Sequence, residues 1–177
     1  SRVIVLTDIT NEPDDEQSMV RFLCYVNEFD VEGVVATTSC WLRNRVAPEQ
    51  IEERVTAYDQ VRNNLLTHAP NYPPMAFLMD RIKTGLPVYG MDGVGQGKMS
   101  AGSQLIVEAI DKPDPRPVWV CVWVIVWLGW RIWVIVYGWR RGCFVFVGLG
   151  GIWGRRECCV WWRDGDVKLW RVCECGV

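Results

Sequence analysis

The sequence predicts an α/β fold, with a Rossmann-like, mostly parallel sheet and helices on both faces. The apolar runs at 3–7, 31–37 and 118–122 are near-continuous instead of alternating, which is typical of parallel strands buried on both faces. Segments with helical spacing separate these runs, and such alternation indicates βαβ units with right-handed crossovers. A chain of 177 residues is long enough to bury a sizeable core.

The first predicted elements are a strand, a helix and a second strand. Residues 3–7 form the first apolar run. Residues 14–29 predict a helix, because apolar residues recur at three- and four-residue spacing, namely Met19, Phe22, Leu23 and Val26. Residues 31–37 then predict the second strand.

The middle of the chain predicts two helices around a break. Pro48 is expected to open the first of them, since proline suits the first helical turn. Its inner stripe would be Ile51, Val55, Tyr58, Val61 and Leu65. Residues 71–74 contain two prolines and predict the break, after which a short helix is expected near 76–83.

A glycine-rich loop is predicted at 85–102, before the last helix and strand of this part. Its run Gly-x-Gly-x-Gly-Lys at 93–98 is not a P-loop, and no strand runs directly into it, so nucleotide binding is not expected. Ser103 is expected to cap a helix through Ile110. A turn-rich link, 111–117, then leads into the strand.

Three carboxylates, Asp8, Asp14 and Asp15, lie between the first strand and the first helix, in the stretch TDITNEPDD at 7–15. Ligands of open α/β sheets bind at the carboxyl ends of strands. Grouped carboxylates there can hold a hard cation such as Ca²⁺, and one can serve as a general base. Helix capping by Asp14 or Glu12 is the alternative, but capping does not need Asp8. The pattern alone leaves both interpretations open.

The stretch 8–15 and several later strings together resemble the nucleoside hydrolases. The resemblance is to a bacterial branch, the nucleoside-hydrolase-like domain of proteins described as cellulose-binding. The agreeing strings are EGVVATTS at 32–39, YGMDGVGQGK at 89–98, Gly102-Ser103 and DPRPVWV at 114–120. They occur in the expected order and cover residues 1 to about 123.

The resemblance implies a Ca²⁺-dependent N-glycosidase that acts on a nucleoside or another small sugar substrate. Carried over by position, Asp8 would be a Ca²⁺ ligand and the catalytic base that activates water. Asp15 would be the second metal ligand, and Asp14 would bind sugar hydroxyls, with Asn11 beside it. Trp41, after the second strand, could stack on a sugar or a base, although helix packing is an equal alternative.

Two departures from the nucleoside hydrolases bear on sugar recognition. Those enzymes have a further Asp where this chain has Thr10, and an Asn where it has Cys40-Trp41. The remaining Ca²⁺ ligand, a late Asp, would lie beyond the region of resemblance. Whether the chain is an enzyme is therefore an open question, and a non-catalytic carbohydrate-binding or interaction domain is the alternative.

The composition changes sharply after residue 117. From Val118 to the end there is no Ala, Ser, Thr or Pro, and six of the eight Cys and ten of the eleven Trp lie there. Ala and Ser are among the commonest residues of globular proteins, and the codons of the four missing types are mainly those with C in second position. We therefore expect residues 1–123 to be the N-terminal part of the α/β domain and 124–177 to be an atypical tail, read in a shifted frame. A truncated or frameshifted product without function is a further alternative.

As written, the tail has several interpretations. The run 118–136 is near the length of a membrane span, but its central Arg131 disfavours one. Two β-hairpins are predicted, the first from 133–137 and 143–147, the second from 160–162 and 167–170 around Asp164-Gly165. Cys158, Cys159, Cys173 and Cys175 lack zinc-ribbon spacing and are weak metal candidates.

Composition also limits the classes of function. The net charge of −2 favours neither nucleic acid nor an acidic substrate. The chain has one histidine, His68, so a Ser-His-Asp or Cys-His mechanism has little support. Ser1-Arg2 leads straight into the first strand, so an export signal has been removed or was never present. The compartment of this bacterial-type sequence and its oligomeric state remain open. Cys24 and Cys40 are expected to be buried, since both have apolar neighbours.

Overall fold

A computed structural model of the chain describes residues 1–10, 12–123, 143–148, 157–163 and 166–169. Its sheet has the order β3-β2-β1-β4-β5-β6-β7. The strands are β1 (Arg2–Thr7), β2 (Asp30–Ala36), β3 (Ile82–Thr84), β4 (Val118–Trp123), β5 (Cys143–Gly148), β6 (Glu157–Arg163) and β7 (Asp166–Leu169). The helices are α1 (Pro13–Cys24), α2 (Pro48–His68), α3 (Met75–Asp80) and α4 (Ala101–Asp111), with short 3₁₀ turns at Val26–Glu28 and Gly90–Gly93.

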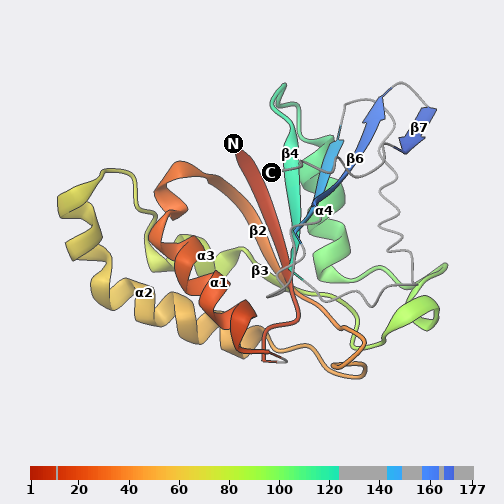
Figure 1. Cartoon of the computed structure of the whole chain (residues 1–177), viewed down its shortest axis with the longest axis horizontal. Helices are drawn as coiled ribbons and strands as arrows, with labels where there is room; N and C mark the ends of the chain where they lie inside the picture. The colour runs from red at the N-terminus through yellow and green to blue at the C-terminus, as the bar shows by residue number, and fades with distance from the viewer. Residues whose placement is uncertain (11, 124–142, 149–156, 164–165, 170–177) are drawn as a thin grey trace, which may run out of the picture.

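The sheet is parallel from β3 through β5, and helices cover both of its faces (Figure 1). Alternate residues of β1 enter two separate cores. Val3 and Val5 pack on the side of α1, α2 and α3, while Ile4 and Leu6 pack on the side of α4. Because both faces of β1 are buried, residues on both faces are apolar. The near-continuous apolar runs therefore predicted the fold class correctly.

Helix α4 approaches β2 closely because each element has a glycine at the contact. A Cβ atom at Gly102 would lie 2.4 Å from Cγ1 of Val35, and one at Gly33 would lie 2.5 Å from a methyl carbon of Leu105. Real Cβ atoms do not come so near, so these two positions set the spacing between helix and sheet.

Arg2 fastens the amino ends of the central strands. Its side chain is 1 % exposed, its Nε donates to Glu32 at 2.6 Å, and its Nη atoms donate to the backbone carbonyls of Ala109 and Arg116. One buried cation thus joins β1, β2, the end of α4 and the link to β4. Nothing in the sequence pattern singled out this residue.

Several predicted boundaries were wrong. The first helix ends at Cys24 instead of continuing to residue 29, because the backbone leaves helical geometry at Tyr25 and a 3₁₀ turn follows. The predicted helix near 76–83 ends at Asp80, and the short strand β3 follows it. Ser100, not Ser103, caps α4, and its hydroxyl accepts from the backbone N–H of Ser103.

Two predictions of burial also failed. Val61 is exposed, although Tyr58 before it is buried and Leu65 after it is half-buried against the core. Cys24 is exposed at the end of α1, and Cys40 is only half-buried.

The tail contributes β5, β6 and β7, and the last two confirm the second predicted hairpin. β6 and β7 pair antiparallel, with Trp162 opposite Val167 and Arg163 opposite Asp166. The partner predicted for 143–147, residues 133–137, lies outside the described residues with the rest of 124–142. The same holds for Cys173 and Cys175 and for the side chains of Cys158 and Cys159. Among the helices that the structure describes, none is long and apolar enough to cross a membrane.

Candidate functional site

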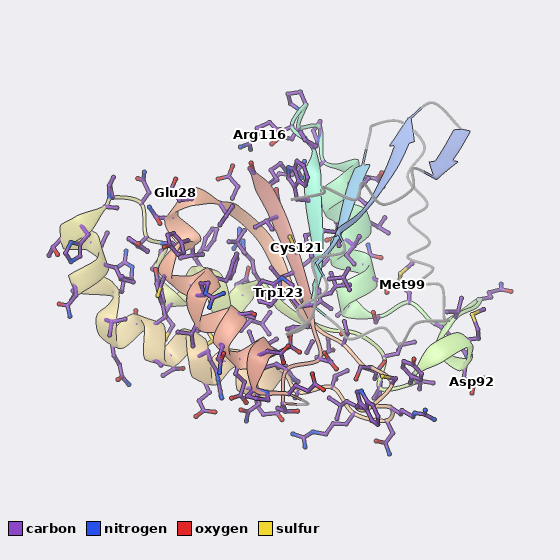
Figure 2. All side chains as sticks on the ribbon, in the orientation of Figure 1. Glu28, Asp92, Met99, Arg116, Cys121 and Trp123 are labelled. Atoms are coloured by element: carbon purple, nitrogen blue, oxygen red, sulfur yellow. The ribbon has the colours of Figure 1, made fainter. Side chains whose placement is uncertain are left out.

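The candidate site lies where β1, β2 and β4 end. Thr7, the last residue of β1, pairs with Ala36 of β2 on one side and with Trp123 of β4 on the other. The loops that follow β1 and β2 therefore leave the sheet at the same edge, the lower edge in Figure 1. Trp123 marks that edge on β4, and Arg116 precedes the opposite end of the strand (Figure 2).

Asp8 and Asp15 meet at this edge as a buried carboxyl pair. Asp8 follows β1 and is 3 % exposed, and Asp15 is in the first turn of α1 and is 8 % exposed. Burial, followed by the hydrogen bond and the negative charge of Asp8, raises the pKa of Asp15 to about 8. The charge of Asp14 adds to this, and a hydrogen bond from Thr7 opposes it. At neutral pH a proton therefore stays on the pair.

Two buried oxygen atoms at this edge lack a partner. Within the described residues, Oδ2 of Asp8 and Oγ1 of Thr37 are the buried side-chain atoms that make no hydrogen bond. Thr37 follows β2 as Asp8 follows β1, and its backbone N–H donates to the carbonyl of Thr7 at 2.8 Å. The two residues are thus neighbours across the strand ends. Buried polar atoms without partners are rare in native proteins, and a bound ion or an ordered water can satisfy them.

The backbone between Asp8 and α1 is strained. Thr10 has a φ of 94°, although its β-branched side chain disfavours positive φ. Such outliers concentrate at functional sites. Asp14 is half-buried in the first turn of α1, beside the carboxyl pair. Asn11, which was predicted to contact substrate, lies outside the described residues.

Trp41 lies on the loop that follows β2, and its side chain is 60 % exposed. It therefore does not serve as a helix-packing residue, which was the alternative to stacking on a ligand. Its backbone N–H donates to Oγ of Ser39, a fully buried residue. The indole is thus presented to solvent by a fixed turn.

Comparison with known proteins identifies the family. One family model, described as "Cellulose-binding Sde182, nucleoside hydrolase-like domain", matches residues 2–126. The chain belongs to this family. The resemblance seen in the motifs is therefore confirmed over nearly the same residues, and the match ends close to the change in composition.

A solved structure agrees with this assignment. It is a nucleoside hydrolase-related hypothetical protein from Saccharophagus degradans that is associated with carbohydrate metabolism. The identity is 47 %, the TM-score is 0.65, and the match covers 68 % of this chain and 29 % of that protein. The present chain therefore spans less than a third of that relative. The search of curated proteins gave no match.

The family's resemblance to nucleoside hydrolases implies a cation at Asp8 and Asp15, and part of a donor set is present. The Asp8–Asp15 pair has hard oxygen donors and holds a proton at neutral pH. Oδ2 of Asp8 and Oγ1 of Thr37 are without hydrogen-bond partners. A divalent cation could replace the shared proton and satisfy both atoms. In the part of the chain that the structure describes, no three His, Cys, Asp or Glu side chains gather closely enough to hold a metal ion. The described residues therefore offer a hard cation two carboxylates and one hydroxyl, fewer ligands than the six to eight oxygens that Ca²⁺ takes.

Thr37 was the functional candidate that the sequence analysis missed. Its hydroxyl gave no motif, because threonine is ordinary at the end of a β-strand. The signal that could have found it is the register: Thr37 holds the same place after β2 that Asp8 holds after β1.

Proposed function

We propose that Asp8, Asp15 and Thr37 form the cation-binding half of a site for hydrolysis of an N-glycosidic or related sugar bond. The observation that carries the proposal is the buried, proton-sharing pair with its unpartnered Oδ2. The missing half would come from residues beyond the matched region, since Ca²⁺ takes six to eight oxygen ligands. Full activity is therefore a property of the longer domain, and this chain supports it only in part.

In this proposal Asp8 is the base that accepts a proton from the attacking water. Asp14, half-buried at the rim, is placed to accept hydrogen bonds from sugar hydroxyls, and Asn11 is a second candidate for that role. Bound Ca²⁺ would lower the pKa of the water and orient it. Neighbouring carboxylates would stabilise a sugar with oxocarbenium character, as in glycoside hydrolysis generally.

Calorimetric titration of the chain with Ca²⁺ tests the cation site. Asp8→Ala and Asp15→Ala should abolish the binding heat, whereas Asp59→Asn, an exposed carboxylate on α2, should leave it intact. Asp59→Asn is the control because it removes an exposed carboxylate of α2, outside the carboxyl pair. Unchanged Ca²⁺ affinity in both site variants would contradict the assignment.

A second candidate is a non-catalytic carbohydrate-binding domain. It is favoured by Thr10 and Cys40-Trp41, which replace an Asp and an Asn of the nucleoside hydrolases, and by the family's description as cellulose-binding. Its ligand would be a β-1,4-linked glucan. Release of free base from nucleosides, or of sugar from glycosides, would establish hydrolysis. Glucan binding without any release would establish the second candidate.

A third candidate is a frameshifted product without function. It rests on the composition of 118–177, and the family match stops at residue 126. Sequencing the coding DNA across codons 115–130 tests it. A family-like continuation in another frame would support the frameshift, and its absence in both alternative frames would refute it.

A further inference from the structure

The edge of the sheet that carries the carboxyl pair also carries much of the exposed apolar surface. Eleven large hydrophobic side chains are exposed in the described part of the chain, and six of them lie on two loops at this edge. One loop follows β2 and the other follows β3. The six residues are Trp41, Val88, Tyr89, Met91, Val94 and Met99. Met99, with Asp92, lies on the second loop, which projects beside the sheet (Figure 2).

Hydrogen bonds within the first loop fix the backbone at Trp41. Oγ of Ser39 accepts from the backbone N–H groups of Trp41 at 3.2 Å and Leu42 at 3.1 Å, and the N–H of Ser39 donates to the carbonyl of Leu42. Ser39 itself is fully buried. The backbone at Trp41 is therefore already ordered, and stacking of a ligand would cost only the rotamer freedom of the indole.

Arg43 joins the two loops. The N–H of Tyr89 donates to the carbonyl of Arg43 at 2.9 Å, and the guanidinium carbon of Arg43 lies 5.6 Å from the centre of the Tyr89 ring. Its Nε donates to the carbonyl of Cys40 at 2.8 Å. No carboxylate among the described residues pairs with Arg43. Arg43 is exposed, so its remaining N–H groups face solvent beside the Tyr89 ring, two residues after Trp41 in the chain.

We infer that Trp41, Arg43 and Tyr89 form a subsite for a β-1,4-linked glucan chain. This inference rests on the proposed sugar ligand and gives that ligand a location. The C–H faces of a flat sugar ring stack on aromatic side chains, which combine an apolar face with a polar rim. Arginine donors can bond the equatorial hydroxyls at the ring edge. The surface has too few cations for nucleic acid, since the two loops hold only Arg43, Arg45 and Lys98, and Arg45 pairs with Glu49.

Binding of cellohexaose to the full chain tests the subsite, measured by calorimetry and by retardation in native gels that contain hydroxyethyl cellulose. Trp41→Ala and Tyr89→Ala should each weaken binding about tenfold, or about 1.4 kcal/mol, as loss of one stacking contact predicts. Trp41→Phe should restore part of the affinity. Maltohexaose, whose α-linked chain is curved, should bind weakly to every variant.

Tyr25→Ala is the matched control, because Tyr25 is an exposed aromatic at the end of α1, far along the chain from both loops. Its affinity for cellohexaose should equal that of the unchanged chain. Absence of binding, equal affinity in all variants, or an equal loss in Tyr25→Ala would overturn the subsite. Circular dichroism of Trp41→Ala and Tyr89→Ala should show a native fold, so that a lower affinity for cellohexaose can be attributed to the missing side chain and not to unfolding.

These variants test the proposed subsite and the proposed cation site independently of each other. Asp8→Asn should remove Ca²⁺ binding and leave the affinity for cellohexaose unchanged. Trp41→Ala should weaken cellohexaose binding about tenfold and leave Ca²⁺ binding unchanged. Retained Ca²⁺ binding in Asp8→Asn contradicts the proposed cation site and leaves the subsite supported. An unchanged affinity for cellohexaose in Trp41→Ala contradicts the subsite and leaves the cation site supported.

Discussion

Replacing Asp15 with Asn should stabilise the metal-free chain at neutral pH. The folded state holds the Asp15 proton with a pKa of about 8, against 3.8 for an ordinary Asp. Below about pH 4 both folded and unfolded states keep the proton, so the group has no effect there. As the pH rises toward 8, the unfolded state releases the proton first, and the folded state loses stability relative to it. Asn has no proton to lose, and its amide can donate to Asp8.

The expected size follows from the shift. Each pKa unit corresponds to about 1.36 kcal/mol, which sets a ceiling of about 4 kcal/mol at pH 7. The effective dielectric constant that reproduces pKa values in proteins is about 20 even at buried sites, so we expect about half of this ceiling, or about 2 kcal/mol, at pH 7. The advantage of Asp15→Asn should therefore be below about 1 kcal/mol at pH 5 and grow to about 3 kcal/mol at pH 8.

Urea unfolding followed by circular dichroism, in buffers that contain EDTA and span this pH window, measures the difference. The difference in unfolding free energy between Asp59→Asn and the unchanged chain should not depend on pH. At pH 7, addition of Ca²⁺ to about a hundred times its Kd should reverse the order of stability, because Ca²⁺ stabilises only the protein that binds it, by about 2.7 kcal/mol. A stability difference that does not change with pH, or an Asp15→Asn variant that is less stable at pH 7, would refute the assigned proton.

Three other substitutions have defined outcomes. Arg2→Met should cost about 3 to 5 kcal/mol in chemical denaturation, because it leaves Glu32 and two carbonyls without their buried donor; an unchanged midpoint would show that the fastening is dispensable. Gly102→Val should cost about 1 to 3 kcal/mol through overlap with β2, while Ala101→Val, on the exposed side of α4, should cost far less. Thr37→Val should keep the fold and weaken Ca²⁺ binding roughly tenfold; equal affinity by calorimetry would remove Thr37 from the site.

The parts of the fold that were predicted are those where composition and burial are tied directly. Strands buried on both faces must be apolar throughout, so β1, β2 and β4 were visible as runs. β3 was missed because it has three half-buried residues at the edge of the sheet, and its partner β2 is some fifty residues away. An edge strand of that length is defined by pairing, which no local pattern encodes.

The candidate site divides in the same way. Asp8 and Asp15 were expected to meet because a strand end and the start of the next helix are adjacent in a βαβ unit. The metal assignment itself stays a prediction. Thr37 depends on the register between two strands, and Arg43 and Tyr89 depend on how two loops meet, so their roles required coordinates.

The contrast between Arg2 and Asp8 is the physical reason to regard the carboxyl edge as functional. Both residues are charged and buried: Arg2 is the first residue of β1, and Asp8 directly follows its last. Arg2 donates to a carboxylate and two carbonyls, as a structural charge should. Asp8 instead shares a proton with Asp15, leaves Oδ2 without a partner beside Thr37, and is followed by Thr10 in a strained conformation. These features of Asp8 raise the free energy of the folded state at the carboxyl end of β1. At the amino end of the same strand, the buried charge of Arg2 has all its hydrogen bonds satisfied by the protein. Local conflicts of this kind are expected where a ligand supplies the missing interactions.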